Sequence, residues 1–330
     1  MVTIKDIAER AGVSFSTVSK ALRGSSLVQE NTKRHILAIA EQMGYQPNMA
    51  ARSLVSKRTG AIGVLWPSIE RAALTSLLTG LNDKLEQEGY TTLLSISRME
   101  AAVAAFRRFQ VDAILVFGDK QLDPGLIDKR MRIPVLAYGA AGQTPFSTVD
   151  VNRGQAIRLA VRHLAELGHR AIAYVGRPQT DDPLQTVKIA AFREEARRFG
   201  LTLTDAAVVD MKGLDFHDGY LAARQLLAQP QRLSAVISGG IDLTRGMLRA
   251  FHEQGVRVPQ EMSVVSYDQL PQMDNLDVPM TATGVPIDAA AAAVAQTLLE
   301  LIETPQSLRA VHLEPELVVR ASTAAPRLAP

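Results

Sequence analysis

Apolar residues near the start of the chain recur at helical spacing and predict a short amphipathic helix over residues 4–11. Thr3 followed by Asp6 has the pattern of a capping box, so the helix can begin at Ile4. Gly12 can adopt the left-handed conformation that often ends a helix. The pattern therefore predicts a short helix followed by a tight glycine turn.

A second helix and a third follow this turn. Ser14 can cap a helix that runs to about Leu22, and residues 30–43 repeat apolar side chains at helical spacing before Gly44. Two short helices joined by a glycine turn form a helix-turn-helix unit, whose second helix lies in the major groove of DNA. An ordinary three-helix bundle with one polar face is the other interpretation of this pattern.

The outer face of the predicted second helix carries side chains that suit DNA. Hydroxyl groups and cations can contact base edges and phosphates, and an aromatic ring adds an apolar contact. The candidate DNA-binding residues in and around this helix are Thr3, Ser14, Phe15, Ser16, Thr17, Ser19, Lys20 and Arg23.

A further short helical segment is expected at residues 48–56, after Pro47. It is too short to persist alone in water, since isolated helices below about 12 residues are marginal. Three stretches of the chain resemble the lactose-repressor (LacI/GalR) family of bacterial transcription regulators. They are TIKDIAERAGVSFSTVSKALRG (3–24), YQPNMAARSL (45–54) and TGAIGVLW (59–66).

In that family the second stretch forms a hinge helix that folds when the protein binds DNA. The leucine at the position of Leu54 enters the minor groove at the centre of the operator, where an apolar wedge kinks the duplex. The resemblance implies that the further DNA-binding residues are Tyr45, Asn48, Ala51, Arg52 and Leu54.

The positive charge of the chain is concentrated at its start. Residues 1–60 contain nine Lys and Arg against four Asp and Glu, whereas the remaining 270 residues contain 27 against 30. The excess positive charge therefore lies in the segment that the resemblance assigns to DNA, as contact with phosphates requires.

Length and composition exclude several other classes of protein. A chain of 330 residues predicts two or three domains. The absence of cysteine fits a reducing cytoplasm and excludes thiolate metal sites. Charged residues interrupt any apolar run at the start, so we expect no secretion signal, and no stretch approaches the roughly 18–20 apolar residues of a membrane span. We therefore expect a soluble, cytoplasmic protein without a cofactor, a metal site or a membrane partner.

Beyond residue 60, short apolar runs alternate with longer helical patterns. Strands are expected at residues 61–66, 91–96, 113–117, 134–138, 171–176, 206–210, 234–238 and 263–268. Amphipathic helices are expected at residues 74–88, 155–167, 186–199, 216–228 and 243–254. Buried strands that alternate with helices predict parallel sheets covered on both faces.

This pattern begins afresh near Val151, which indicates two doubly wound subdomains. The fold class is therefore α/β, with an N-terminal helix-turn-helix head (1–46), a hinge helix and linker (47–60) and a body (61–330). The N-subdomain comprises about 61–150 plus 285–305, and the C-subdomain about 151–284 plus 306–330, with a helix at 287–302 and a late strand at 311–319 crossing back. The resemblance implies that these parallel-sheet subdomains are like those of periplasmic sugar-binding proteins, with the ligand in the cleft between them.

The family's effector site can be located by resemblance at three positions. Asp268 matches an acidic residue that accepts hydrogen bonds from sugar hydroxyls, a task that suits a carboxylate. Lys188 stands where the family usually has arginine, so the cation remains but the bidentate geometry is lost. Gly240 and Ile241 stand where the family usually has Asn-Asp, so the usual contacts to a hexose are not all present.

These departures leave two possibilities for the effector site. Asp242 can substitute for the missing acid, or the effector differs in kind. Arg71 and Lys188 can face a phosphate or a carboxylate, and Asp150 completes the candidate effector-binding residues. VFGD (116–119) and the loop around TDDPLQTVK (180–188) also resemble trehalose-type repressors, whose effector is a sugar phosphate.

No motif supports catalysis, so we expect no catalytic residues. The chain lacks GxxxxGK, GxGxxG after a strand, HExxH and GxSxG. A secreted binding protein would carry a signal where this chain has a DNA-binding head. The sequence predicts a homodimeric transcriptional regulator that binds double-stranded operator DNA. The first interpretation is a repressor of carbohydrate-metabolism genes that is controlled by a sugar, a sugar acid or a sugar phosphate. The alternatives are a sugar-phosphate-responsive regulator or an activator and, more distantly, an α/β enzyme.

Overall fold

The computed structural model describes residues 2–22, 24–45, 58–118, 133–140, 144–177, 182–202, 207–230, 232–305 and 307–327. It separates into two compact units, a head of residues 1–59 and a body of residues 60–330. Each unit is built around hydrophobic cores of its own.

The head contains the helix-turn-helix that the sequence predicts, formed by α1 (Ile4–Ala11), α2 (Phe15–Leu22) and α3 (Glu30–Gln42). One fully buried side chain from each helix lies in its core: Ile7, Val18 and Ile36. The expected capping box begins α1, because the Thr3 hydroxyl accepts the Asp6 N–H at 3.4 Å and the Asp6 carboxylate accepts the Thr3 N–H at 2.7 Å. Gly12 ends this helix with φ +64°, a conformation that glycine adopts without strain.

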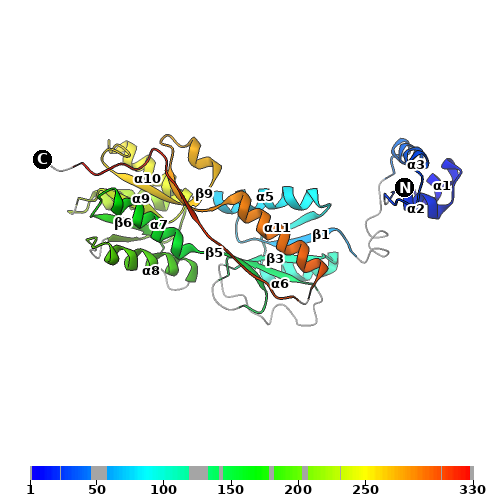
Figure 1. The fold of residues 1–330 in the computed structure, drawn as a ribbon, viewed down its shortest axis with the longest axis horizontal. Coiled ribbons are helices and arrows are strands. Elements are labelled where there is room, and N and C mark those ends of the chain that lie inside the picture. Colours follow the sequence, from blue (N-terminus) through cyan, green and yellow to red (C-terminus); the bar gives the residue numbers. More distant parts are fainter. Residues whose placement is uncertain are drawn as a thin grey trace. The chain divides into compact units, whose positions relative to one another are not determined.

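The first sheet of the body is parallel throughout and has the strand order β11-β5-β4-β3-β1-β2. Its strands are β1 (Ala61–Leu65), β2 (Thr91–Ser95), β3 (Ala113–Phe117), β4 (Val135–Tyr138), β5 (Ser147–Val151) and β11 (Ala310–Leu313). Helices α5 (Ala72–Gln87) and α11 (Ile287–Glu303) pack together on one face, and α6 (Met99–Phe109) covers the other (Figure 1). Leu81 and Leu298 are fully buried in the first of these layers, and Phe106 is buried in the second.

The second sheet has the order β12-β10-β9-β8-β6-β7 and is parallel except for β12, which runs antiparallel to β10. Its strands are β6 (Ile172–Gly176), β7 (Val208–Asp210), β8 (Ala235–Ser238), β9 (Ser263–Gln269), β10 (Thr281–Pro286) and β12 (Glu316–Val318). Helices α7 (Arg153–Glu166) and α8 (Pro183–Arg198) cover one face, and α9 (Phe216–Leu227) and α10 (Ile241–Glu253) cover the other (Figure 1). The predicted pair of doubly wound subdomains is therefore confirmed.

Within the described residues the chain passes between the two sheets three times. After β5 it enters α7, after β10 it enters α11, and after β11 it reaches β12. The last passage differs from the expected division of the body. The late strand is in fact two strands, and β11 pairs with β5 in the first sheet, so residues 310–313 do not belong to the second subdomain.

Two described strands, one α-helix and the short 3₁₀-helix Pro271–Asn275 are not among the elements expected from the sequence. Strand β5 alternates buried and half-buried residues and includes Asp150, so it lacks a continuous apolar run. Strand β10 contains Gly284 and Pro286, which are rare inside strands. Helix α6 buries Ala102, Val103 and Phe106 on one face, a helical spacing that the sequence analysis did not use. In the two strands tertiary packing compensates for a weak local pattern.

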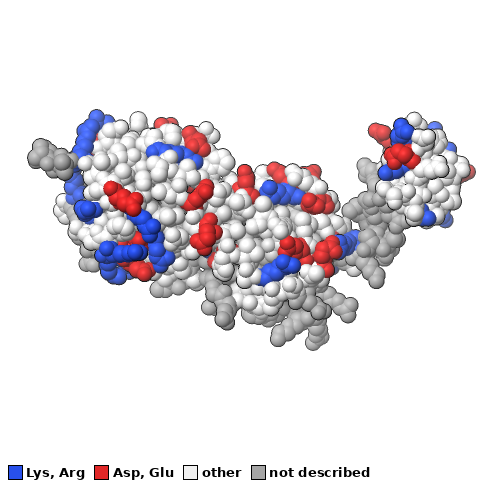
Figure 2. Space-filling view, in the orientation of Figure 1, with Lys and Arg blue, Asp and Glu red and all other residues white. Residues whose placement is uncertain are grey.

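The surface of the body carries both signs of charge. On the face that Figure 2 shows, acidic and basic side chains are interspersed over the body. This agrees with the nearly balanced charge of the chain beyond residue 60. None of the described helices is long and apolar enough to cross a membrane.

Gly246→Ala should destabilise the body, because α9 and α10 approach each other closely at this glycine. A Cβ atom there would overlap the Phe216 carbonyl oxygen and lie 2.7 Å from the Tyr220 nitrogen. Overpacking of this kind costs roughly 1–3 kcal/mol, and we expect a loss near the upper end in the free energy of unfolding, measured by urea denaturation. Arg245→Ala, at an exposed position on the same helix, is the matched control and should change stability by less than about 0.5 kcal/mol. Equal stability of the two variants would show that these helices can separate there without cost.

Candidate functional site

A cavity of about 390 Å³ lies between the two sheets, at the carboxyl ends of their strands. The residues that end β3, β4 and β5, which are Phe117, Tyr138 and Val151, line it together with Asp268 near the end of β9. Ligands of parallel α/β sheets bind at this edge. The cavity is therefore the candidate effector site, in the position that the sequence predicts.

Helix N-termini surround this cavity, and four of those in the described residues are bonded to a carboxylate. The first backbone N–H groups of a helix have no partner inside the helix and carry partial positive charge, so an acidic acceptor stabilises them. The acceptors are Asp242 on α5 (Ala72 N, 3.1 Å), Asp182 on α8 (Leu184 N, 3.1 Å), Asp215 on α9 (Asp218 N, 2.9 Å) and Asp268 on α10 (Ile241 N, 3.4 Å). These carboxylates are therefore already bonded to the protein.

Asp268 has an unusual backbone conformation at the edge of the cavity. Its φ is +84°, in the left-handed region that residues other than glycine rarely adopt. Gly284 on the neighbouring strand makes room for this conformation, since a Cβ atom there would lie 2.9 Å from the Gln269 nitrogen. Strained backbone of this kind persists only where the surrounding structure holds it, and it is concentrated at binding sites.

Lys188 extends from α8 into the wall of the cavity and is almost completely buried, with 3% of its surface exposed. Its Nζ donates to the Gly239 carbonyl at 3.0 Å and lies 3.4 Å from the centre of the Tyr267 ring, and both contacts favour the charged amine. Burial nevertheless lowers the pKa of Lys188 to about 7, although the nearby Asp268 carboxylate opposes this effect. The amine therefore changes charge close to neutral pH.

Arg153, at the start of α7, lines both this cavity and a second one. The second cavity, of about 520 Å³, is also lined by Asp150, His312 and Glu314. Asp150 forms an ion pair with Arg153, whose guanidinium also donates to the Val151 carbonyl at 3.1 Å. The positive charge of Arg153 is therefore already compensated.

Three buried polar atoms of the cavity wall have no hydrogen-bond partner within the part of the chain that the structure describes: Arg71 Nε, Gln185 Oε1 and Gln269 Oε1. Buried polar groups are normally paired with protein, water or ligand. Tyr138 and Tyr267 add hydroxyl groups whose pKa is raised by burial, that of Tyr138 to about 12, so both are protonated at neutral pH. The wall thus offers donors and acceptors. No cluster of acidic or histidine side chains that could hold a metal ion occurs in the described ranges.

The structure places the five candidate effector-binding residues in different surroundings. Asp268, Lys188 and Arg71 all line the first cavity. Asp150 lines the second cavity, where it is held in its ion pair. Asp242 does not line the first cavity: it caps α5, and burial raises its pKa. Asp242 therefore caps a helix of the other subdomain and does not line the first cavity in this structure.

Sequence reasoning misses several residues of the cavity wall, among them Phe117, Tyr138, Arg153, Arg177, Gln185 and Tyr267. Four of these lie at or beside the carboxyl end of a predicted strand, so strand ends are a signal that could have found them. Arg153 and Gln185 instead come from the first turns of α7 and α8, and no pattern in the sequence marks them.

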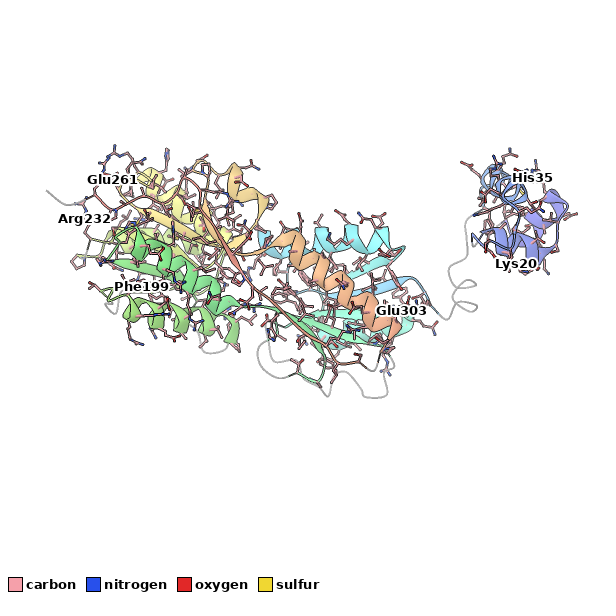
Figure 3. The ribbon with its side chains drawn as sticks, viewed as in Figure 1. Lys20, His35, Phe199, Arg232, Glu261 and Glu303 are labelled. Carbon is pink, nitrogen blue, oxygen red and sulfur yellow. The ribbon has the colours of Figure 1, made fainter. Side chains whose placement is uncertain are left out.

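The candidate DNA-binding residues of the head lie along α2 and around it. Phe15 is 53% exposed, and Lys20 is half-buried. The Ser14 hydroxyl accepts the Thr17 N–H at 3.1 Å and lies 2.8 Å from the Thr17 hydroxyl, so it serves as the cap that the sequence predicts. Figure 3 shows Lys20 on the side of the head away from His35 of α3.

The remaining candidates in the head differ in exposure. Thr3 and Ser16 are exposed, whereas Ser19 is half-buried. Tyr45 is also half-buried and packs against the core of the head. The candidates Arg23, Asn48, Ala51, Arg52 and Leu54 lie outside the described residues.

Two family models match the chain. Residues 3–48 match the model of bacterial regulatory proteins of the lacI family, and residues 161–323 match that of the periplasmic binding protein-like domain. The HTH-type transcriptional repressor PurR of Escherichia coli O139:H28 is 29% identical over 337 residues, which cover 98% of this chain and 97% of that protein.

Solved structures have the same fold. The lac repressor dimer bound to operator and the anti-inducer ONPF superimposes with a TM-score of 0.84 at 24% identity, covering 98% of this chain and 99% of that one. A LacI family regulator from Enterococcus faecium with bound ribose superimposes with a TM-score of 0.72 at 22% identity, covering 81% of this chain and 100% of that one.

A helix-turn-helix head and a body of the periplasmic-binding-protein type together define a DNA-binding transcription regulator and not an enzyme. Residues 3–48 carry the DNA-binding head of the lacI family of bacterial regulatory proteins. The resemblance to this family and the α/β fold class inferred from it are therefore confirmed, whereas the expected hinge helix at residues 48–56 lies outside the described residues.

Replacing Lys188 with Met should change how the stability of the body depends on pH. The pKa of Lys188 in the folded state, about 7, lies below its ordinary value, so between these two values the unfolded chain binds one proton more than the folded chain. Relative to Lys188→Met, the wild type should become more stable as pH rises above 7, by up to about 1.4 kcal/mol per pH unit, and the difference should be constant below pH 7. Urea unfolding of both proteins between about pH 6 and 9 measures this difference. A difference that does not change with pH would mean that Lys188 stays charged in the folded protein.

Proposed function

We propose that this regulator represses carbohydrate-metabolism genes and that a small sugar or sugar-derived molecule controls its affinity for operator DNA. The main support is the cavity at the strand ends, whose wall combines Asp268 and two unpartnered glutamine oxygens with the cations Lys188 and Arg71. Acceptors and donors in one cavity suit a molecule that carries several hydroxyl groups.

Molecules bound to related proteins give this proposal further support. The lac repressor structure contains operator and ONPF, and the Enterococcus faecium regulator contains ribose. This chain has Gly240 where the family usually has asparagine, so its effector requires other partners. Gln185 and Gln269, each with a buried oxygen that lacks a partner in the described structure, are suitable ones.

Movement of the two subdomains relative to each other would couple the cavity to DNA. An effector changes DNA affinity only by binding one arrangement of the protein better than another. Two hydrogen bonds connect the subdomains beside the cavity, from the Ala72 N–H to Asp242 at 3.1 Å and from Gln272 Nε2 to the Ser76 hydroxyl at 3.2 Å. Closing or opening the cleft would make or break these bonds. Because the body follows the proposed hinge in the chain, a change in the pairing of two bodies would move the hinge helices.

We assign DNA recognition to a two-fold dimer of heads. One helix-turn-helix reads only a few base pairs, and dimers of such heads read two related half-sites. In this proposal α2 enters the major groove, with Phe15 and Lys20 among its contacts, and Leu54 is the wedge in the minor groove.

A regulator that responds to a sugar phosphate is the second candidate. Arg71 Nε is buried without a partner, and Lys188 has no carboxylate within ion-pair distance among the described residues. Both observations favour an anionic effector. An activator differs from a repressor in where its operator lies relative to the promoter, and mapping that position distinguishes the two.

Lys20→Ala should weaken operator binding by about 1–3 kcal/mol if Lys20 reads a base. The measurement is titration, at one salt concentration, of an operator that the protein selects from random DNA and of single-base variants of that operator. A base contact predicts that the variant protein loses discrimination at one position. A uniform loss across all operator variants would instead identify Lys20 as a phosphate contact. His35→Ala is the control, because Figure 3 places His35 away from Lys20, and it should bind as the wild type does.

Asp268→Asn should reduce effector affinity by roughly 1.5–3 kcal/mol, the usual contribution of a hydrogen bond to a charged group. It should leave the DNA affinity of the ligand-free protein unchanged. Asparagine keeps the shape of the side chain and tolerates a φ of +84° better than alanine does.

A thermal-shift screen of sugars and sugar derivatives identifies the effector for this test, because ligand binding raises apparent stability, and calorimetry then measures its affinity. Asp210→Asn, at an exposed position that ends β7, is the matched control. An Asp268→Asn protein that responds at the wild-type effector concentration would place the effector site elsewhere.

A further inference from the structure

The charges around the first cavity are compensated unequally. The carboxylates beside it that accept an N–H group at a helix N-terminus are Asp182, Asp215, Asp242 and Asp268. Glu70, which also lines the cavity, is exposed to solvent. Arg153 has its counter-charge in Asp150, and Arg177 also has a partner. The cations of the wall that remain are Lys188 and Arg71.

Neither Lys188 nor Arg71 has a carboxylate within ion-pair distance among the residues that the structure describes. Lys188 Nζ donates to the Gly239 carbonyl and lies against the Tyr267 ring, and the buried Arg71 Nε has no hydrogen-bond partner within the described part of the chain. The two lie in the wall of the same cavity, close enough for the charge of Arg71 to lower the pKa of Lys188. A buried charge without an ion-pair partner costs free energy, which applies to Lys188, while Arg71 is half-buried and its Nε atom is buried. The pair therefore indicates a ligand that supplies negative charge.

The N-terminus of α5 also favours a negatively charged ligand in this cavity. Arg71 is the N-cap residue of this 16-residue helix, and Ala73 and Leu74 in its first turn also line the cavity. Asp242 accepts the N–H of Ala72 from the side of α10. The N–H groups of a first helical turn point out of the N-terminus and favour an anion there. Arg71 and a helix N-terminus thus lie in the same cavity wall as Lys188.

We propose that the effector carries one anionic group, a carboxylate or a phosphate, which binds between Lys188 and Arg71 at the start of α5. This inference rests on the proposed function and narrows its ligand to a sugar acid or a sugar phosphate. The hydroxyl groups of the ligand bind the acceptors elsewhere in the wall. Gln185 is one of these, since it is only 6% exposed and its Oε1 has no hydrogen-bond partner in the described structure.

Binding of the anion is linked to a proton on Lys188. The charged groups that act on this amine are Asp268 and Asp182, which favour its charged form, and Arg153 and Arg71, which oppose it, while the Tyr267 ring lies against it. Burial has the largest effect and brings the pKa to about 7. Because only the protonated amine attracts an anion, binding above pH 7 must take up a proton. The affinity should therefore be constant below pH 7 and fall about tenfold per pH unit above it.

Matched trios of a neutral sugar, its acid and its phosphate test this proposal on the full chain. The probes are glucose, gluconate and glucose 6-phosphate, with the corresponding galactose and ribose compounds, titrated calorimetrically between about pH 6 and 9. We expect an anionic member of one trio to bind at least about tenfold more tightly than its neutral member at the acidic end of this range. Comparison of the acid with the phosphate identifies the anionic group. The acid keeps a constant charge over this range, so its pH profile reports on Lys188 alone.

Two variants test the contributions of Lys188 and Arg71 separately. Lys188→Arg keeps a positive charge at every pH and should abolish the pH dependence of binding. Arg71→Gln should weaken the binding of the anionic ligand about tenfold at all pH values, and the dependence of affinity on pH should remain. It should leave the affinity for the neutral sugar of the trio unchanged. Circular dichroism and DNA binding of the ligand-free variants establish that each is folded.

Two results would overturn the anion site while leaving a sugar-responsive regulator in place. One is tighter binding of the neutral member of a trio, and the other is a pH profile that Lys188→Arg does not alter. Failure of every member of every trio to bind would overturn the proposed function and the anion site together.

Discussion

Parallel strand order imposes the constraint on which the rest of this body depends. In a parallel α/β sheet the carboxyl ends of the strands and the N-termini of the following helices lie at the same edge. Two such edges meet at the first cavity, so N–H groups that no helix can satisfy internally converge there. The protein supplies a carboxylate to α5, α8, α9 and α10. Asp242 belongs to the second subdomain and caps α5 of the first, so helix capping also joins the subdomains.

The two departures from the family pattern in the cavity change its chemistry together. Gly240 removes a side chain beside Asp268, and Lys188 replaces a guanidinium with an amine that contacts the adjacent Gly239 carbonyl. An arginine keeps its charge at any physiological pH, whereas the charge of a buried lysine depends on its surroundings. A fixed fork of hydrogen-bond donors has therefore become a single group that titrates near neutrality.

Local pattern was sufficient for most of the fold, because apolar runs and helical periodicity are strong in the central strands and the amphipathic helices. It failed where an element depends on its neighbours, as in β5 with Asp150 and β10 with Gly284. The same holds for the cavity. Asp268 and Lys188 could be located because each matches a motif position. Arg153 could not, because its place in the wall depends on the turn from β5 into α7 and on an ion pair that only the folded chain forms.

The first sheet is completed only after nearly all of the second has been synthesised. Helix α11, which covers its core on the side of α5, and its outer strand β11 follow all the strands of the second sheet except β12 along the chain. A nascent chain therefore builds the second subdomain while one apolar layer of the first is still uncovered. Translation that stalls or terminates in this interval releases a chain with an exposed apolar face, which is the kind of surface that chaperones and proteases recognise.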